Sequence, residues 1–242
     1  MTKRLIDILI SIFGLICTSP VILFLLILIW LQDKKTPLYI APRVGKNGVM
    51  FNLVKLRSMR INSESLNINS TSEKDIRITS IGKKIRKYKL DEFTQFWNVL
   101  VGDMSLVGPR PNVQTETDLY TDIEKKLLSV KPGITDFSSI VFSDEGKILE
   151  YEKDPDLAYN QLIRPWKSRL GLIYIKHQSI FLDLQIIIFT FVALISKKKA
   201  LHLVCNKLKE LDIDEKIISV SKRKNKLYPY PPPGSNHIVN KR

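Results

Sequence analysis

The sequence has few of the residues that build disulfide frameworks or soft-metal centres. Its 242 residues include two cysteines, Cys17 and Cys205, and three histidines. The two cysteines are too few and too far apart for a disulfide framework or a metal cluster, and a reducing cytoplasm is their natural compartment. The histidines are scattered and show no ligand spacing. These counts therefore give no support to a secreted disulfide scaffold or a zinc site.

Formal charge is missing from Ile8 to Leu31, a run of 24 residues rich in Leu, Ile, Val and Phe. A helix of that length spans about 36 Å, and the hydrocarbon core of a bilayer is about 30 Å thick. A cleaved signal peptide fits poorly, because the apolar region is too long and no small-residue cleavage site follows it. We therefore expect this segment to reside in a membrane.

Two features of the apolar run argue against a simple crossing. Ser19 and Pro20 lie in its middle, where proline removes a backbone donor. Basic residues flank it on both sides, at positions 3–4 and 34–35, and the positive-inside rule then places both ends in the cytoplasm. From the residues alone, a kinked spanning helix and a helix that bends and returns to its own side both remain open.

Positive charge is concentrated near the C-terminus. The chain carries 38 Lys and Arg against 24 Asp and Glu, a net charge of +14, and residues 197–242 hold 12 of those cations and four of those anions. Beside a membrane anchor, such an excess indicates attraction to anionic lipid headgroups, and nucleic-acid binding is the competing interpretation. We expect residues 200–242 to be a basic extension, partly disordered around the prolines at 231–233.

The rest of the chain alternates between short strands and helices. Apolar patterns predict strands near 37–40 and 50–57, and polar residues predict a surface loop at 61–74. Helical patterns follow at residues 80–100, 115–129, 145–177 and 200–227. A second apolar stretch, 180–195, contains Asp183 and is short for a crossing, so a helix in the core or at the membrane interface is favoured over a second span.

The densest chemical signal is the acidic pair Asp91 and Glu92, followed by the loop-forming segment 102–111. Alone, such a pair most often complements a helix dipole. Here it has cationic neighbours in sequence, namely Arg77, Lys83, Lys84, Arg86, Lys87, Lys89 and Arg110. A cationic neighbourhood at a helix start favours phosphate oxygens, and carboxylates in it can bind a divalent metal or attack phosphorus. Lys55 and Arg57 could equally be a solvated strand end.

Together these segments resemble the monotopic phosphoglycosyl transferases, the bacterial sugar transferase family. The matching motifs are Lys3-Arg4-Leu5-Ile6-Asp7, Ser19-Pro20, 43–48, 55–59, 75–79 with Gly82 and Arg86, 90–92, 98–100, 102–111, 131–135, and Ser179 with Asp183 and Thr190. They cover about residues 1–196, and their order makes the match specific.

The resemblance implies a fold and a reaction. The fold is mixed α/β and helix-rich: a re-entrant membrane hairpin (1–35) broken at Ser19 and Pro20, a small cytoplasmic catalytic domain (36–199) with amphipathic interface helices, and the extension 200–242. The reaction moves a sugar-1-phosphate from a UDP-sugar to undecaprenyl phosphate with Mg²⁺, releases UMP and initiates a surface glycan. It places the enzyme at the cytoplasmic face of the bacterial inner membrane, with the bilayer and downstream glycosyltransferases as partners and no nucleic acid.

The resemblance also assigns residues. Asp91 would be the nucleophile that forms a covalent phosphosugar intermediate, and Glu92 would coordinate the metal. Five further residues would serve the substrate phosphates: Lys55, Arg57, Arg86, Arg110 and Pro111. The runner-up function is a basic membrane adaptor that binds anionic lipid or nucleic acid without catalysis.

Three departures from the family pattern bear on the donor. Thr94 stands where proline is common after the acidic pair, residues 136–139 replace a Gly-Trp-Ala-Gln run, and Gly171 stands where an acidic residue is common. Thr in a first helical turn carries little penalty, so we expect activity to survive. These changes put the sugar in doubt and leave the reaction class intact.

Overall fold

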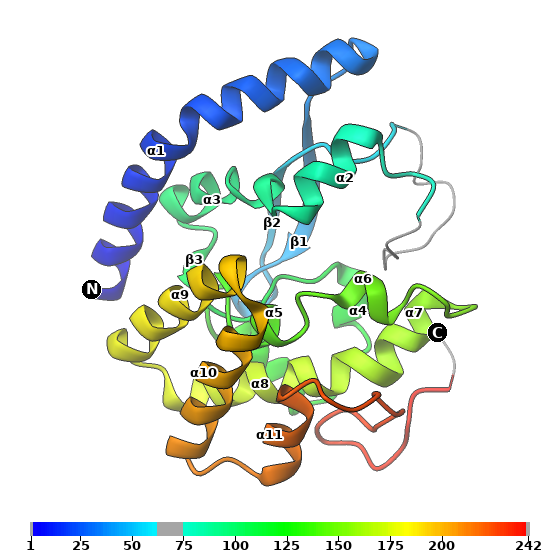
Figure 1. The fold of residues 1–242 in the computed structure, drawn as a ribbon. Coiled ribbons are helices and arrows are strands. Elements are labelled where there is room, and N and C mark those ends of the chain that lie inside the picture. The colour runs from blue at the N-terminus through cyan, green and yellow to red at the C-terminus, as the bar shows by residue number, and fades with distance from the viewer. Residues whose placement is uncertain (1, 62–74, 241–242) are drawn as a thin grey trace.

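The structure is a computed structural model that describes residues 2–61 and 75–240 (Figure 1). It has the mixed α/β, helix-rich character that the sequence predicts, with one long apolar helix at the N-terminus. The loop predicted at 61–74 lies outside the described residues, apart from Ile61.

The described elements occur in the following order. The first half holds α1 (Thr2–Asp33), β1 (Leu38–Val44), η1 (Lys46–Gly48), β2 (Met50–Leu56), α2 (Ser80–Lys87), η3 (Leu90–Glu92), α3 (Gln95–Val101), β3 (Ser105–Val107) and α4 (Gln114–Thr117). The second half holds η4 (Glu124–Ser129), β4 (Gly133–Thr135), α5 (Phe137–Val141), α6 (Glu145–Ile148), α7 (Pro155–Ala158), the π-helical turn η5 (Tyr159–Ile163), α8 (Arg164–His177), α9 (Ile180–Ile195), α10 (Lys197–Glu210) and α11 (Glu215–Ser221).

The strands form two small sheets. β1 and β2 make an antiparallel hairpin in which Leu38 pairs with Leu56 and Val44 pairs with Met50. Both strands occur where the apolar patterns predict them, and β1 continues to Val44, beyond the predicted 37–40. β3 and β4 are parallel, because the helical segment between them carries the chain back to the same edge. The predicted helices at 80–100 and 115–129 are each interrupted, at 88–94 and 118–123.

Helix α1 is continuous through Pro20 and bends along its length, so its two arms lie at an angle to each other (Figure 1). Proline has no N–H to donate to the carbonyl of Ile16, four residues earlier. The Ser19 hydroxyl donates to that carbonyl instead, at 2.8 Å, and the Thr18 hydroxyl donates to Gly14 O at 2.6 Å. The Ser19 hydroxyl thus supplies the donor that Pro20 cannot give to the Ile16 carbonyl.

Both ends of α1 are fastened to the same folded domain. At the N-terminal end, Lys3 Nζ lies 2.5 Å from Asp183 Oδ2, and Asp7 accepts hydrogen bonds from Ser105 Oγ at 2.9 Å and Leu106 N at 3.1 Å. At the C-terminal end, Asp33 forms a two-pronged ion pair with Arg57, with both N–O distances at 2.6 Å. Between these attachments the outer face of the helix exposes apolar side chains.

Two other helices continue this exposed apolar surface. α9 buries Leu182, Ile186 and Phe189 and turns a second apolar face outward. On that face lie Phe181, Leu184, Ile188, Phe191, Leu194 and Ile195. On α3, Trp97 is 52% exposed, whereas the polar Gln95 and Asn98 are buried. One face of α9 therefore lies in the core, and its opposite apolar face is exposed.

The C-terminal region packs into the main core, which differs from the partly disordered extension that its composition predicts. Ala200, Val204 and Leu208 of α10 recur at spacings of four and are fully buried in the same cluster as Phe137 and Tyr174. After α11 the chain runs back over α8, where the ring of Tyr230 stacks on Trp166 with centroids 4.5 Å apart. Residues 200–240 are thus an integral part of the domain.

Candidate functional site

A cleft of about 360 Å³ opens where the hairpin, the turn before α3 and the helices α6 and α8 meet. Six cations and four carboxylates contribute to its lining. The cations are Arg43, Lys55, Arg86, Lys89, Arg110 and Lys167, and the carboxylates are Asp91, Glu92, Glu116 and Glu145. Of the site residues predicted from the sequence, Asp91, Glu92, Lys55, Arg86, Arg110 and Pro111 all lie here. The excess of positive charge suits an anionic ligand such as a diphosphate.

The acidic pair stands on a single 3₁₀ turn, η3, that is pinned to strand β2. Lys89 adopts a left-handed conformation (φ 53°), which ends α2 and starts the new turn. The Thr94 hydroxyl then donates to Val54 O at 2.9 Å and lies 3.2 Å from Asp91 O. The amide of Asn98 repeats this attachment one turn later, with Nδ2 donating to Asn52 O at 2.7 Å. The turn therefore holds Asp91 beside Lys55, the next residue on the strand.

Arg110 reaches the cleft from a loop that depends on two glycines. The loop after β3 crosses β4 so closely that a β-carbon on Gly133 would lie 2.1 Å from Gly108 N, and one on Gly108 would lie 2.5 Å from Lys131 O. Only glycine permits this approach. The Arg110 guanidinium donates to Ile134 O and extends to the acidic pair.

Glu92 and Arg110 form an ion pair that is accessible from the cleft. Their Oε1 and Nη2 atoms lie 2.6 Å apart, and each side chain is 21% exposed. Burial alone would raise the pKa of Glu92, but the charges of Arg110, Lys55 and Lys89 outweigh it and lower that pKa to about 2. Glu92 is therefore a carboxylate at any physiological pH.

In Asp91 the effect of burial on the pKa outweighs that of the neighbouring cations. Asp91 is 9% exposed, and burial raises its pKa, while the charges of Lys55 and Arg86 act to lower it and that of Glu92 adds to the rise. The two adjacent carboxylates thus have pKa values shifted in opposite directions, a pattern typical of sites where paired acidic groups take different roles. Burial also lowers the pKa of Lys55, against the opposing charges of Glu92 and Asp91.

Arg57 lies elsewhere, which departs from the expectation that it binds substrate phosphate. It follows the end of β2, is 5% exposed, and its guanidinium is occupied by Asp33 at the end of α1. Its Nε also donates to Thr36 O at 2.7 Å. The structure gives it the role of fastening the end of α1 to the hairpin. The sequence predicts a break at Ser19 and Pro20, whereas α1 runs as one continuous helix through both residues.

One interacting group of cleft residues, Lys167, Glu145 and Tyr159, was not predicted from the sequence. Lys167 of α8 pairs with Glu145 of α6, and its ammonium lies 5.2 Å from the ring centroid of Tyr159. Burial alone would lower the pKa of Lys167, but the nearby Glu145 more than compensates, so the net shift is upward. The signal in the sequence is faint, because each residue lies in a helical region without a local motif.

Of the residues that depart from the family pattern, Ser139 lines the cleft, whereas Thr94, Asp136 and Gly171 do not. Thr94 supplies the hydroxyl that links η3 to β2, a contact that proline could not make. A β-carbon on Gly171 would lie 2.7 Å from Leu127 Cδ2, so this glycine lets α8 pack closely against Leu127 of η4. Asp136 caps α5 by accepting from Ser139 N at 2.7 Å. Burial raises the pKa of Asp136.

Mg²⁺ fits this set of donors. The described residues contain no group of three or more His, Cys, Asp or Glu side chains arranged to hold a metal on their own. Mg²⁺ does not require one, because it is commonly held by one or two carboxylates and completes its shell with phosphate oxygens and water. Asp91 and Glu92 supply such carboxylates at the cleft wall.

The family model for bacterial sugar transferases matches residues 1–197. The chain is 36% identical over 201 residues to the galactosyl transferase CpsE of Streptococcus agalactiae serotype III (strain NEM316), covering 78% of this chain and 41% of that protein. It is 35% identical over 188 residues to the uncharacterized sugar transferase EpsL of Bacillus subtilis (strain 168), covering 78% of this chain and 84% of that one.

A third relative has a name that specifies both substrates. It is the UDP-N-acetylgalactosamine-undecaprenyl-phosphate N-acetylgalactosaminephosphotransferase of Aeromonas hydrophila, 36% identical over 192 residues. That match covers 78% of this chain and 42% of the relative. The chain thus spans about two fifths of the length of this protein and of CpsE. These comparisons give no support to a non-enzymatic membrane adaptor.

Proposed function

Because the chain belongs to the bacterial sugar transferase family, we propose that it transfers a sugar-1-phosphate from a UDP-sugar to undecaprenyl phosphate. The observation that carries the proposal is the cleft itself, in which the buried Asp91 lies among cations and next to the Glu92–Arg110 pair. Transfer of this kind would begin the assembly of a surface glycan at the cytoplasmic face of the inner membrane.

The reaction divides into two displacements. A carboxylate oxygen of Asp91 attacks the phosphorus attached to the sugar, the bond from that phosphorus to the UMP oxygen breaks, and UMP leaves with the electron pair. A phosphate oxygen of undecaprenyl phosphate then attacks the same phosphorus and expels the Asp91 carboxylate. Two steps let one cleft accept its two anionic substrates in turn.

The cations around Asp91 make this attack feasible. A carboxylate and a diphosphate repel each other, so the cleft must offset the charge before they can meet. Lys55 and Arg86 exert their charge on Asp91 and favour its ionised form. Arg110 is placed to donate to phosphate oxygens as well as to Glu92, because the pair is open to the cleft.

Glu92 is the residue we assign to Mg²⁺, since its low pKa keeps it ionised. When bound, the metal would supply positive charge to the diphosphate. The remaining contributions come from the chain: Lys55, Arg86 and Arg110 line the cleft, and Pro111 shapes the loop that presents Arg110.

The attachment of α1 supports a re-entrant placement in the membrane. A helix that crosses a bilayer has its ends about 30 Å apart on opposite sides. Here Lys3 at one end and Asp33 at the other bind a single domain. We therefore propose that α1 dips into one leaflet and returns, with the exposed faces of α3 and α9 beside it.

The test uses the purified full chain, undecaprenyl phosphate, Mg²⁺ and a panel of UDP-sugars, with UMP release as the readout. Asp91→Asn removes the nucleophile, so UMP release should fall to background and no phosphosugar adduct should be trapped on the protein. Asp122→Asn is the matched control, because the Asp122 side chain is 95% exposed and does not line the cleft.

Full turnover in Asp91→Asn would overturn the proposed nucleophile. Loss of UMP release on chelation of Mg²⁺, restored by adding it back, would support the metal assignment. Deleting residues 200–242 is unsuitable as a test of the adaptor alternative, because Val204 and Leu208 belong to the core.

A further inference from the structure

A second hollow, of about 630 Å³, lies between α10 and the segment that follows α11. We call it the basic groove. Its lining residues are Asp144, Lys197, Lys198, Leu201, His202, Cys205, Asn206, Lys209, Lys222, Arg223 and Lys224. All of them except Asp144 and Lys197 lie beyond residues 1–197, the part that the family model matches. The groove is therefore built largely by the region that sets this chain apart from the family model.

The charges of the basic groove do not balance. Six of its lining side chains are lysine or arginine, and Asp144 is its single lining carboxylate. Asp144 lies 2.7 Å from Lys197 Nζ and 3.8 Å from Arg223 Nη2, so one anion serves two cations. Lys222 has a partner outside the lining, Glu215, at 3.2 Å.

The three remaining cations, Lys198, Lys209 and Lys224, form no ion pair within residues 2–61 and 75–240. Like charges gathered without counterions repel one another, and an anion between them relieves that repulsion.

Buried donors in the groove also lack partners. Nε and Nη1 of Arg223 are buried and donate to no acceptor within the described part of the chain. Burial lowers the pKa of Lys197, and Asp144 only partly restores it. Each of these N–H groups can donate one charge-assisted hydrogen bond to a phosphate oxygen. The groove thus has the chemistry of a phosphate-binding site.

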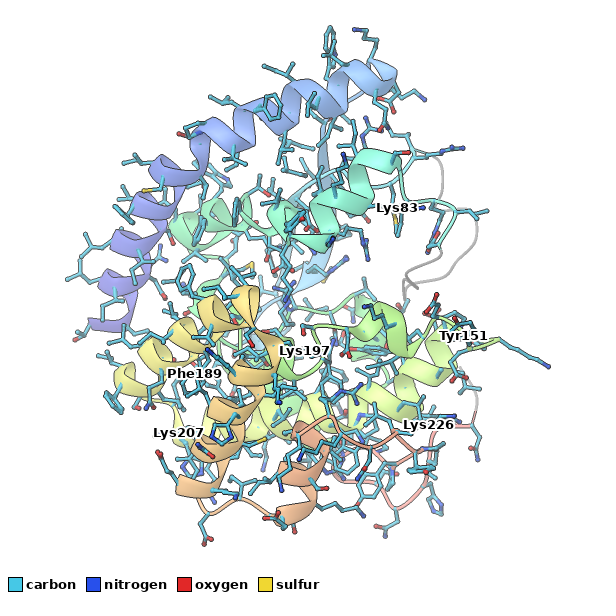
Figure 2. The ribbon with its side chains drawn as sticks, viewed as in Figure 1. Lys83, Tyr151, Phe189, Lys197, Lys207 and Lys226 are labelled. Carbon is cyan, nitrogen blue, oxygen red and sulfur yellow. The ribbon has the colours of Figure 1, made fainter. Side chains whose placement is uncertain are left out.

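Its position indicates where such a phosphate comes from. Ser196 alone separates Lys197 from Ile195, which ends the exposed apolar face of α9 and is 89% exposed. Lysines that directly follow a lipid-facing helix lie at the level of the headgroups. Figure 2 shows Lys197 near the start of α10, with Lys207 further along the same helix. The groove therefore begins at the depth where lipid phosphates are found.

We infer that the basic groove binds the phosphate-bearing headgroup of an anionic phospholipid from the membrane in which α1 and α9 lie. This is a separate site from the catalytic cleft, and it does not depend on the proposed transfer reaction. It fixes the C-terminal region to the bilayer as a third attachment, beside α1 and the apolar face of α9.

The experiment places the full chain in nanodiscs of phosphatidylcholine with phosphatidylglycerol that carries a photoreactive headgroup. Crosslinked residues are mapped by mass spectrometry and should fall in 197–209 and 222–224. The test variant is K198Q/K209Q/K224Q. Each cation near an anionic surface strengthens binding by about fivefold, so losing three should lower the crosslinking yield by at least about tenfold.

The matched control, K125Q/K126Q/K153Q, removes the same charge from exposed lysines outside the groove and should keep the wild-type yield. Melting temperatures of both variants report whether they fold. Equal yields from the test variant and the wild type, or crosslinks that map elsewhere, would overturn the inference. So would a folded wild type whose crosslinking is suppressed by millimolar inorganic phosphate or a short oligonucleotide as completely as by unlabelled phosphatidylglycerol, because the occupant would then be a soluble anion.

Discussion

Two arginine–glutamate pairs in this molecule have nearly the same geometry and opposite surroundings. Arg110 and Glu92 meet at 2.6 Å in the cleft, with both side chains 21% exposed. Arg164 and Glu124 meet at 2.5 Å in the interior, with side chains 2% and 0% exposed. The distance between the charges does not distinguish them.

The neighbours do distinguish the pairs. Glu124 also accepts from Ser168 Oγ at 2.7 Å, and Arg164 also donates to Asn160 Oδ1 at 2.9 Å, so the interior pair is saturated. A sealed pair of this kind is costly to break, because the remaining partner becomes an uncompensated buried charge. The open pair can exchange one partner for substrate or solvent. Ion pairs are therefore better judged by their other hydrogen bonds than by their separation.

Breaking the interior pair should have the largest effect on stability. Arg164→Met leaves the Glu124 carboxylate buried and unpaired, and we expect it to reduce the free energy of unfolding by about 3–5 kcal/mol. Thermal denaturation of the detergent-solubilised protein measures this. Arg110→Met is the comparison, with an expected loss of about 1 kcal/mol or less because its site is open to solvent. Equal losses in the two variants would mean that the surroundings of an ion pair do not decide its contribution to stability.

Breaking the open pair should instead reduce turnover. Arg110→Met removes a donor to developing charge, and we expect the rate of UMP release to fall by about 10²–10³-fold. Arg110→Lys keeps the charge but lacks the planar fork, so it should recover only part of the rate. If Arg110→Met released UMP at the wild-type rate while folding normally, the arginine would be structural, like Arg164.

The smallest expected effect concerns the pH dependence of activity. It involves Lys55, whose charge acts on Asp91 in the cleft. Asp91 must be ionised to attack, so activity declines as pH falls through its pKa, which burial raises above the ordinary value. Lys55 opposes that rise. Lys55→Met should therefore raise the pKa further and move the acid limb of the kcat/KM profile to higher pH. Lys125→Met, at an exposed position, should leave the limb in place; an unchanged limb in Lys55→Met would contradict the assignment.

The sequence predicts local secondary structure well, but it does not predict which side chains interact across the fold. The β1–β2 hairpin and α9 occur where the apolar patterns place them, since period and length are local properties. Arg57 shows the limit: its position two residues after Lys55 suggests a shared role, but its partner Asp33 lies 24 residues earlier, across a fold that no local pattern specifies.

Composition alone also does not indicate that the C-terminal region packs into the core. Its many lysines favour an extension in solvent, yet Ala200, Val204 and Leu208 form a buried stripe at spacings of four. In the site, the motif order brought Asp91 and Arg110 to attention, whereas Lys167 and Glu145 could be found only once α6 and α8 were seen to face the same cleft.

The double attachment of α1 has a kinetic consequence under the proposed reaction. With Lys3 and Asp33 both bound to the domain, the cleft cannot tilt or lift independently of the helix. The cleft then meets a polyprenyl phosphate by two-dimensional diffusion in the plane of the membrane. The frequency of these encounters depends on the number of acceptor molecules per unit area and on their sideways diffusion, while the nucleotide sugar arrives from the bulk solution. Diluting the acceptor with inert lipid should therefore slow the second displacement even when its total amount is constant.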